Sequence, residues 1–141
     1  ERPQLERHVF TLTASDTLEN LTYLVENLPE VSFHIAAKTN VSDRLEAFKK
    51  YDNVTLYTNV HHDDIIEDLL DQSEIYLDIN HWDQVDSIVD RAVEKGKPVF
   101  AFDNVVHRAE LGASVFSHQD PEMMVKEIQR QLFGIAVDTV N

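Results

Sequence analysis

The chain has 141 residues, of which 43% are hydrophobic, and its 26 acidic and 12 basic residues give a net charge of −14. That length predicts one domain with a hydrophobic core of its own. The negative charge disfavours nonspecific contact with nucleic acids and with anionic membrane surfaces. Cysteine is absent, which excludes disulfides and thiol chemistry. No run of about 18 apolar residues is present, so no segment is expected to span a membrane.

Strand-like and helix-like patterns alternate along the whole chain. Six runs rich in β-branched and aromatic residues predict strands at 8–13, 31–37, 53–60, 74–79, 98–103 and 113–117. Five segments with apolar residues at helical spacing predict helices at 15–28, 42–51, 62–73, 83–96 and 120–133. This alternation predicts an α/β fold, a three-layer, doubly wound parallel sheet of the Rossmann-like type.

Local signals suggest where some of these helices begin and end. Asp16 followed by Glu19 is typical of a capping box at the start of the first helix. Pro121 is expected at the first position of the last helix, and Gly96 is expected to end helix 83–96 in a left-handed conformation. Ile65 is expected on the apolar face of helix 62–73, together with Ile66, Leu69 and Leu70.

In sheets of this kind, ligands bind beyond the carboxyl ends of the strands. The loop after the first strand reads "TLTASD", without the glycine-rich dinucleotide fingerprint. The loop after the fourth strand is more unusual, because the segment "DINHWD" gathers polar residues around the single tryptophan. The candidate donor or acceptor contacts are Asn80, His81, Trp82 and Asp83, with Asn104 and His107 from the loop after the fifth strand.

Each of these residues also has a structural interpretation. Trp82 could stack on a sugar or base, or it could pack over a neighbouring helix. His107 and Glu110 could form a general acid/base pair, or they could bind loop backbone.

The "HHDD" segment at residues 61–64 resembles a set of metal ligands. Adjacent histidines at a helix start do not share a face, so we predict no metal site there.

The segment "EKGKPVFAFDN" and the final amphipathic helix resemble the carboxyl-terminal half of GT-B glycosyltransferases. A large retaining family of that fold has an acid, seven residues and a second acid before the sequence Gly-Lys-Pro-Val. Here Gly96-Lys97-Pro98-Val99 matches the end of that pattern, and the first acid falls on Asp83. The second falls on Arg91, so a base replaces a carboxylate. The basic residues that hold the donor pyrophosphate in that family also have no counterpart in "TLTASD".

Four segments carry a closer resemblance: "LTYLVENLPEVSFHIAA", "YDNVTLY", "IYLDINHWDQV" and "KPVFAFDN". They are similar to the stabilising, chaperone-like subunit of the two-component O-GlcNAc transferase of the accessory Sec system, which serves serine-rich repeat adhesins. The resemblance implies a noncatalytic domain without cofactor or catalytic residues. It also implies a catalytic glycosyltransferase partner, a Ser/Thr-rich acceptor protein, and a cytoplasmic location with peripheral membrane contact through the complex.

Two other functions stay open from the sequence. In one, the chain is the nucleotide-sugar donor-binding domain of an active retaining glycosyltransferase, and the candidate residues hold a UDP-sugar. In the other, it is a stand-alone Rossmann-like binding domain. The chain starts without methionine, close to its first strand. We therefore expect a single Rossmann-like domain, residues 1–141, that forms the carboxyl-terminal half of a longer protein.

Overall fold

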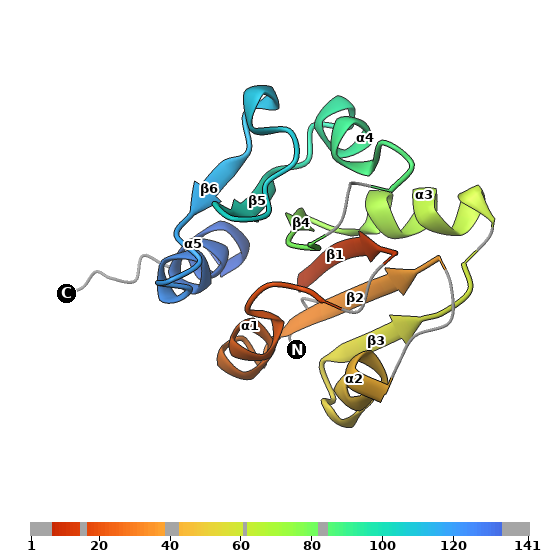
Figure 1. Ribbon diagram of the computed structural model, residues 1–141, viewed down its shortest axis with the longest axis horizontal. Helices are drawn as coiled ribbons and strands as arrows, with labels where there is room; N and C mark the ends of the chain where they lie inside the picture. The colour runs from red at the N-terminus through yellow and green to blue at the C-terminus, as the bar shows by residue number, and fades with distance from the viewer. Residues whose placement is uncertain (1–6, 15–16, 39–42, 61, 82–84, 134–141) are drawn as a thin grey trace.

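The computed structural model describes residues 7–14, 17–38, 43–60, 62–81 and 85–133. In these residues, six strands form one sheet in the order β3-β2-β1-β4-β5-β6. Every neighbouring pair of strands is parallel. The strands are β1 (Arg7–Thr13), β2 (Val31–Ala37), β3 (Val54–Tyr57), β4 (Ile75–Asp78), β5 (Val99–Phe102) and β6 (Ser114–Phe116). The predicted doubly wound, Rossmann-like α/β fold is confirmed (Figure 1).

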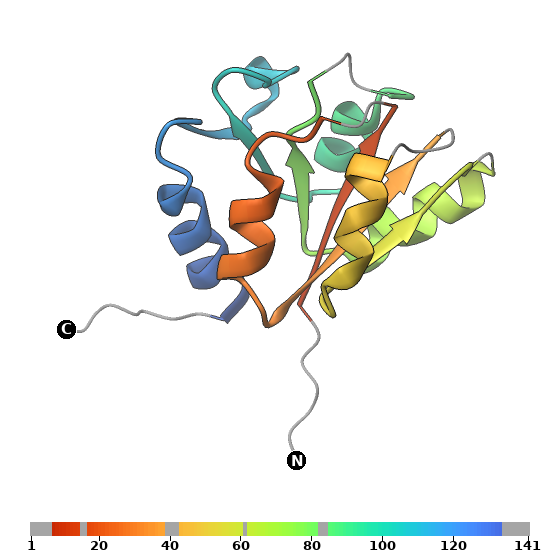
Figure 2. The ribbon, with the colours of Figure 1, turned by 60° about the horizontal axis from the view of Figure 1, so that its bottom comes forward.

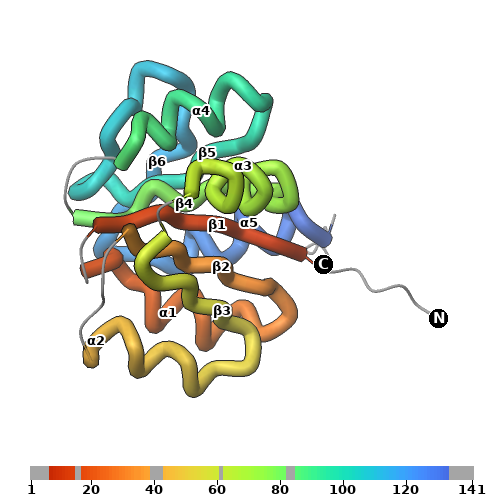
Figure 3. Tube along the Cα trace, turned by 90° about the vertical axis from the view of Figure 1, so that its right-hand side faces the viewer, coloured from red at the N-terminus to blue at the C-terminus, as the bar shows by residue number. Residues whose placement is uncertain are grey.

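Helices cover both faces of this sheet. They are α1 (Leu21–Asn27), α2 (Asp43–Glu46), which continues as the 3₁₀ helix η1 (Ala47–Lys50), α3 (Asp63–Gln72), α4 (Ile88–Glu94), the 3₁₀ helix η2 (Ala109–Leu111) and α5 (Glu122–Phe133). Helices α1, α2 and α5 lie together on one face (Figure 2). Helices α3 and α4 lie on the other, with β1 and β2 in the middle of the molecule (Figure 3).

The core is divided between these two faces because successive side chains of a strand point in opposite directions. Val9 of β1 packs in the cluster under α1 and α5, whereas the next residue, Phe10, packs in the cluster under α3 and α4. Likewise, Leu77 of β4 joins the first cluster and Tyr76 the second. Strands buried on both faces explain why the sequence shows continuous apolar runs rather than alternation.

The first helix begins later than predicted, at Leu21. Leu18 instead forms an antiparallel bridge with Asn80, and the N–H of Glu19 donates to the carbonyl of Ile79 at 2.8 Å. Glu19 is therefore not in the first turn of a helix, and the predicted capping box is wrong. Asp16 lies outside the described residues. Pairing with the loop after β4 outweighs the local capping signal.

Three further helix predictions need correction. Helix α4 begins at Ile88 rather than at residue 83, because Asp86 and Ser87 have positive φ angles of 53° and 54°. Ile65 is 40% exposed and does not face the core. Pro121 lies one residue before α5 instead of at its first position. The left-handed conformation expected of Gly96 is confirmed, with φ at 76°.

Candidate functional site

The carboxyl edge of the sheet between β1 and β4 is the point where the strand order reverses, the usual ligand position in such folds. The ladder between the two strands pairs Val9 with Ile75 and Phe10 with Tyr76. Farther along, the hydroxyl of Tyr76 accepts from the N–H of Leu12 at 3.1 Å and donates to its carbonyl at 3.3 Å. Burial raises the pKa of Tyr76 far above its usual range, which keeps the hydroxyl neutral.

The loops after β1 and β4 are joined beyond that point. The Leu18–Asn80 bridge is flanked by hydrogen bonds from Glu19 to Ile79, at 2.8 Å, and from the N–H of His81 to the carbonyl of Thr17, at 3.2 Å. We call this contact the β1–β4 seam. Asn80 is 1% exposed. The structure therefore places this candidate residue inside the seam, not on an open surface.

The basic side chains beside the seam lie against carboxylates. His81 Nε2 lies 2.7 Å from Glu19 Oε1. Lys38, which follows β2, extends past the end of β1 and places its Nζ 2.9 Å from Asp86 Oδ2 in the loop after β4. Two other candidates, Trp82 and Asp83, lie outside the described residues.

His107 contacts a carboxylate that the sequence reading missed. Its Nδ1 lies 2.5 Å from Oδ1 of Asp78, and its main-chain N–H donates to Oδ2 at 2.8 Å. The Asp78 side chain is 0% exposed and that of His107 is 16% exposed. Glu110, which the sequence left open as an acid/base partner of His107, binds Arg108 at 2.6 Å. The signal for Asp78 was its place in the apolar run "IYLDI", because a buried carboxylate needs a partner.

Asn104 is exposed at the end of β5, next to another histidine–carboxylate pair. Asp103 Oδ1 lies 2.7 Å from His118 Nδ1 and accepts the His118 main-chain N–H at 3.0 Å. These hydrogen bonds, the one from the His118 ring first, lower the pKa of Asp103. Among the described candidates, His81 and His107 follow β4 and β5 as predicted, but they belong to separate pairs and not to one cluster.

Arg91, which takes the position of the second acid in the GT-B pattern, binds two carboxylates of α3. It lies on α4, and its Nη2 is 2.5 Å from Glu67 Oε2 and 3.1 Å from Asp63 Oδ1 of α3. Lys95, directly after α4, also binds Glu67, at 2.8 Å. The hydrogen bonds from Lys95 and then Arg91 lower the pKa of Glu67. The base at this position therefore joins two helices.

Four basic side chains described at the carboxyl edge share one property. Each lies within 3 Å of a carboxylate oxygen: Lys38 at 2.9 Å, His81 at 2.7 Å, His107 at 2.5 Å and His118 at 2.7 Å. Each pair would have to open before its base could neutralise a diphosphate. In the described part of the chain, no three His, Asp or Glu side chains gather as a metal site would require.

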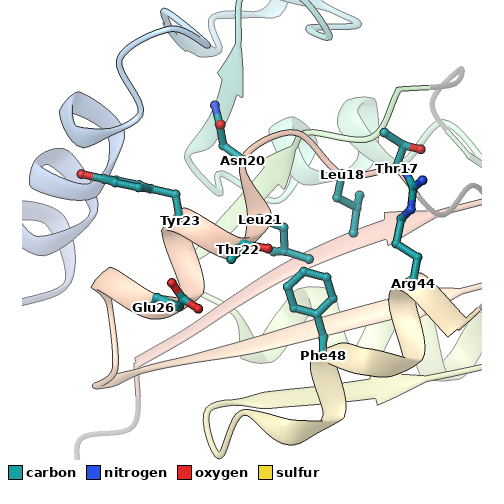
Figure 4. Close-up of a pocket in the computed structure, with 9 residues that line it drawn as sticks. All are labelled: Thr17, Leu18, Asn20, Leu21, Thr22, Tyr23, Glu26, Arg44 and Phe48. Carbon is teal, nitrogen blue, oxygen red and sulfur yellow. The ribbon is translucent and has the colours of Figure 1, made fainter.

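A pocket of about 460 Å³ lies beside this edge, between α1 and the α2–η1 segment. Arg44 and Phe48 point from α2–η1 toward the α1 side, and Arg44 extends toward Thr17 (Figure 4). Sequence reasoning did not find this pocket, because its walls come from helices that the sequence separates by a strand.

The model of one protein family, the GftB/GlyA-F C-terminal domain, matches residues 9–135. The chain belongs to this family. It is 40% identical over 130 residues to the UDP-N-acetylglucosamine–peptide N-acetylglucosaminyltransferase stabilizing protein GtfB of Streptococcus agalactiae, covering 91% of this chain and 29% of that protein. It is also 40% identical over 127 residues to the glycosyltransferase GlyB of Streptococcus pneumoniae serotype 4, covering 90% and 31%.

Solved structures agree with the GftB/GlyA-F assignment. The glycosyltransferase GlyE of Streptococcus pneumoniae TIGR4 matches with a TM-score of 0.85 and 32% identity, over 93% of this chain and 34% of that one. The GtfA/B complex bound to UDP and GlcNAc matches with a TM-score of 0.82 and 34% identity, over 93% and 30%. The predicted resemblance is confirmed at the level of family and fold. No helix among the described residues has the length and apolar character to cross a membrane.

Proposed function

We propose that this chain is part of a noncatalytic GT-B-type subunit that stabilises a partner glycosyltransferase and helps it bind a Ser/Thr-rich acceptor protein for O-GlcNAc transfer. The pairing of the basic side chains at the carboxyl edge is the observation that carries this proposal. The relative named as a stabilizing protein, at 40% identity over 91% of the chain, supports it. The proposal includes a cytoplasmic location, membrane contact only through the complex, and an acceptor exported by the accessory Sec system.

A sugar nucleotide bound at this edge would have to displace the carboxylates that now contact the basic side chains. A diphosphate needs nearby cations or free N–H groups to offset its charge. At this edge, taking His107 from Asp78 would leave a carboxylate with no solvent exposure and without its imidazole partner. Losing that ring costs about 2–3 kcal/mol, because only the main-chain N–H of His107 still donates to the carboxylate. Lys38 and His81 would each have to leave a carboxylate as well. A protein that keeps these pairs closed is suited to a structural role.

The alternative is the donor-binding domain of an active retaining glycosyltransferase that uses a UDP-sugar. One observation favours it, since relatives at similar identity carry glycosyltransferase names, GlyB at 40% and GlyE at 32%. In this alternative, His81, Asn104 and His107 open toward the donor, and their present carboxylate partners are exchanged for phosphate or sugar oxygens.

A transfer assay with the full-length protein separates the two functions. The protein is expressed alone and with a candidate catalytic subunit, and GlcNAc transfer from UDP-GlcNAc to a Ser/Thr-rich acceptor is measured. We expect transfer only when both subunits are present, and no heat of binding when UDP-GlcNAc is titrated into the full-length protein alone. Transfer by the protein alone, or binding at micromolar concentration, would contradict the proposal.

Two single substitutions test whether the chain is noncatalytic or binds the sugar donor. His81→Ala removes the ring that pairs with Glu19, and Asp64→Ala on the exposed surface of α3 is the matched control. Under the noncatalytic proposal, both variants keep the turnover of the two-subunit complex within about twofold, as expected of surface changes away from the chemistry. A selective loss of turnover in His81→Ala would favour the donor-binding alternative.

A further inference from the structure

Two adjoining hollows form one continuous groove between α1 and α2–η1. The larger, of about 460 Å³, begins at Thr17, and the smaller, of about 300 Å³, ends at Tyr51. The two share Thr22, Glu26, Arg44 and Phe48 along their length. We call this surface the α1–η1 groove. We propose that it seats an extended, uncharged, hydroxyl-bearing segment of a peptide acceptor; that the occupant is an acceptor rests on the proposed function.

The groove combines an apolar floor with polar walls. Leu18 and Leu21 are buried beneath it, and Phe48 is half-buried against the same core cluster. Thr22 is exposed on the α1 wall and Arg44 on the opposite wall. Phe48 points toward Thr22 and Leu21 (Figure 4). An apolar floor with a few placed polar groups is the usual composition of a binding cleft.

The charge of the groove suits an uncharged occupant. The chain has a net charge of −14, yet the groove is lined by one carboxylate, Glu26, and two cations, Arg44 and Lys50. The hydroxyl of Tyr51 donates to Glu26 Oε2 at 2.5 Å and closes the far end of the groove. Glu26 is thus engaged with the opposite wall. A neutral polar segment meets neither the repulsion nor the desolvation cost that a charged one would meet here.

The other end of the groove leads to the carboxyl edge of the sheet. Thr17 and Leu18 line the groove and also belong to the β1–β4 seam, through the His81–Thr17 hydrogen bond and the Leu18–Asn80 bridge. A segment lying in the groove would therefore emerge at the switch point, where α/β sheets of this type meet their ligands.

The dimensions set the length of the segment. Helix α1 has seven residues, which at about 1.5 Å per residue span roughly 10 Å. An extended peptide rises about 3.3 Å per residue, so roughly three residues would lie along the helix. Alternate side chains would face the apolar floor, and the ones between them would face the polar walls, where Thr22 and Arg44 lie within reach of a hydroxyl.

Two tryptophan substitutions fill the groove, one from each wall, and are studied in the full-length protein bound to its catalytic subunit. Thr22→Trp acts from α1 and Ala47→Trp from η1, since both positions are exposed. Ile65→Trp is the matched control, because it adds the same ring to α3 on the other face, at a residue that is 40% exposed. Binding of a fluorescein-labelled peptide of alternating serine and threonine is measured by anisotropy. Size-exclusion chromatography and thermal unfolding monitor assembly and folding.

We expect both groove variants to raise the peptide Kd by about tenfold or more. Ile65→Trp should leave the peptide Kd unchanged. All three variants should bind the catalytic subunit and unfold at the same temperature as the parent protein. A peptide Kd unchanged in both groove variants would overturn the groove assignment alone. Loss of subunit association with retained peptide binding would also overturn it, because the groove would then be a subunit interface. Absence of peptide binding by the parent complex would overturn the proposed function together with the inference.

Discussion

The pair formed by Asp78 and His107 allows a quantitative test of how the carboxyl edge is held together. Replacing His107 with alanine removes the ring nitrogen 2.5 Å from Asp78 but keeps the main-chain N–H that donates at 2.8 Å. Removing one hydrogen-bond partner of a buried polar group costs about 1–3 kcal/mol, and more where the group left behind is a carboxylate. Because one hydrogen bond remains and the His107 side chain is 16% exposed, we expect a loss of about 2–3 kcal/mol in the free energy of unfolding.

The assay is urea unfolding at neutral pH, followed by far-UV circular dichroism. His107→Ala should lower the urea midpoint without changing the slope, which reports the surface exposed on unfolding. The double variant Asp78→Asn/His107→Ala should lose less than the sum of the two single variants, because a neutral amide needs no charged partner; we expect a coupling of about 1–2 kcal/mol. An unchanged midpoint in His107→Ala, or strictly additive losses, would refute the reasoning.

Three further predictions concern the sheet, the α3–α4 layer and one turn. Tyr76→Phe should cost about 1–3 kcal/mol in urea unfolding, because it leaves the N–H and carbonyl of Leu12 without the hydroxyl that binds both. The hydrogen bonds from Lys95 and Arg91 lower the pKa of Glu67 below its ordinary value of 4.5. The ionised carboxylate therefore stabilises the fold above pH 4.5, and this stabilisation is lost as the pH falls through the lowered pKa of the folded state. Glu67→Gln should therefore flatten the fall in urea midpoint between about pH 5 and pH 3. Gly96→Ala should lower stability by about 1 kcal/mol through its positive φ alone, since nothing lies within 4 Å of the added Cβ.

Matched variants control each of these. Tyr23→Phe removes a hydroxyl from a half-buried tyrosine of α1 and should change the free energy of unfolding by less than about 0.5 kcal/mol. Asp68→Asn, on the exposed side of α3, should leave the pH dependence as in the parent. Gly96→Asn should be milder than Gly96→Ala, because asparagine tolerates the left-handed region better. If a control matched its test variant, the corresponding contact would have no special role.

The sequence was sufficient for the fold because the central strands, such as β4 and β5, are buried on both faces and read as continuous apolar runs. Strand β2 was predicted with its observed bounds, Val31–Ala37, since its apolar run ends at polar residues on both sides. The alternation with helices predicted a parallel, doubly wound sheet, whereas the strand order β3-β2-β1-β4-β5-β6 came from the structure. Helix starts were less predictable: α1 and α4 begin after residues with positive φ, Asn20 and Ser87, which are set by the path of the neighbouring loops.

The candidate site was predicted by location but not by partners. His81 and His107 do follow β4 and β5, yet their carboxylates are Glu19 and Asp78, which lie 62 and 29 residues away in the chain. Such pairings depend on three-dimensional proximity that local patterns do not encode. The α1–η1 groove was missed for the same reason. The role of the six candidate residues as donor or acceptor contacts stays a prediction.

Both faces of the sheet are held by buried apolar side chains, and the face under α3 and α4 adds a group of ion pairs between the helices. Arg91 and Lys95 lie 2.5 and 2.8 Å from Glu67, well inside the distance of about 8 Å beyond which dissolved ions screen charges at physiological salt. Raising the concentration of a simple salt should therefore weaken these contacts little, whereas an excluded salt such as sulfate strengthens apolar burial on both faces. Sulfate should accordingly stabilise the whole domain and not one helix layer alone.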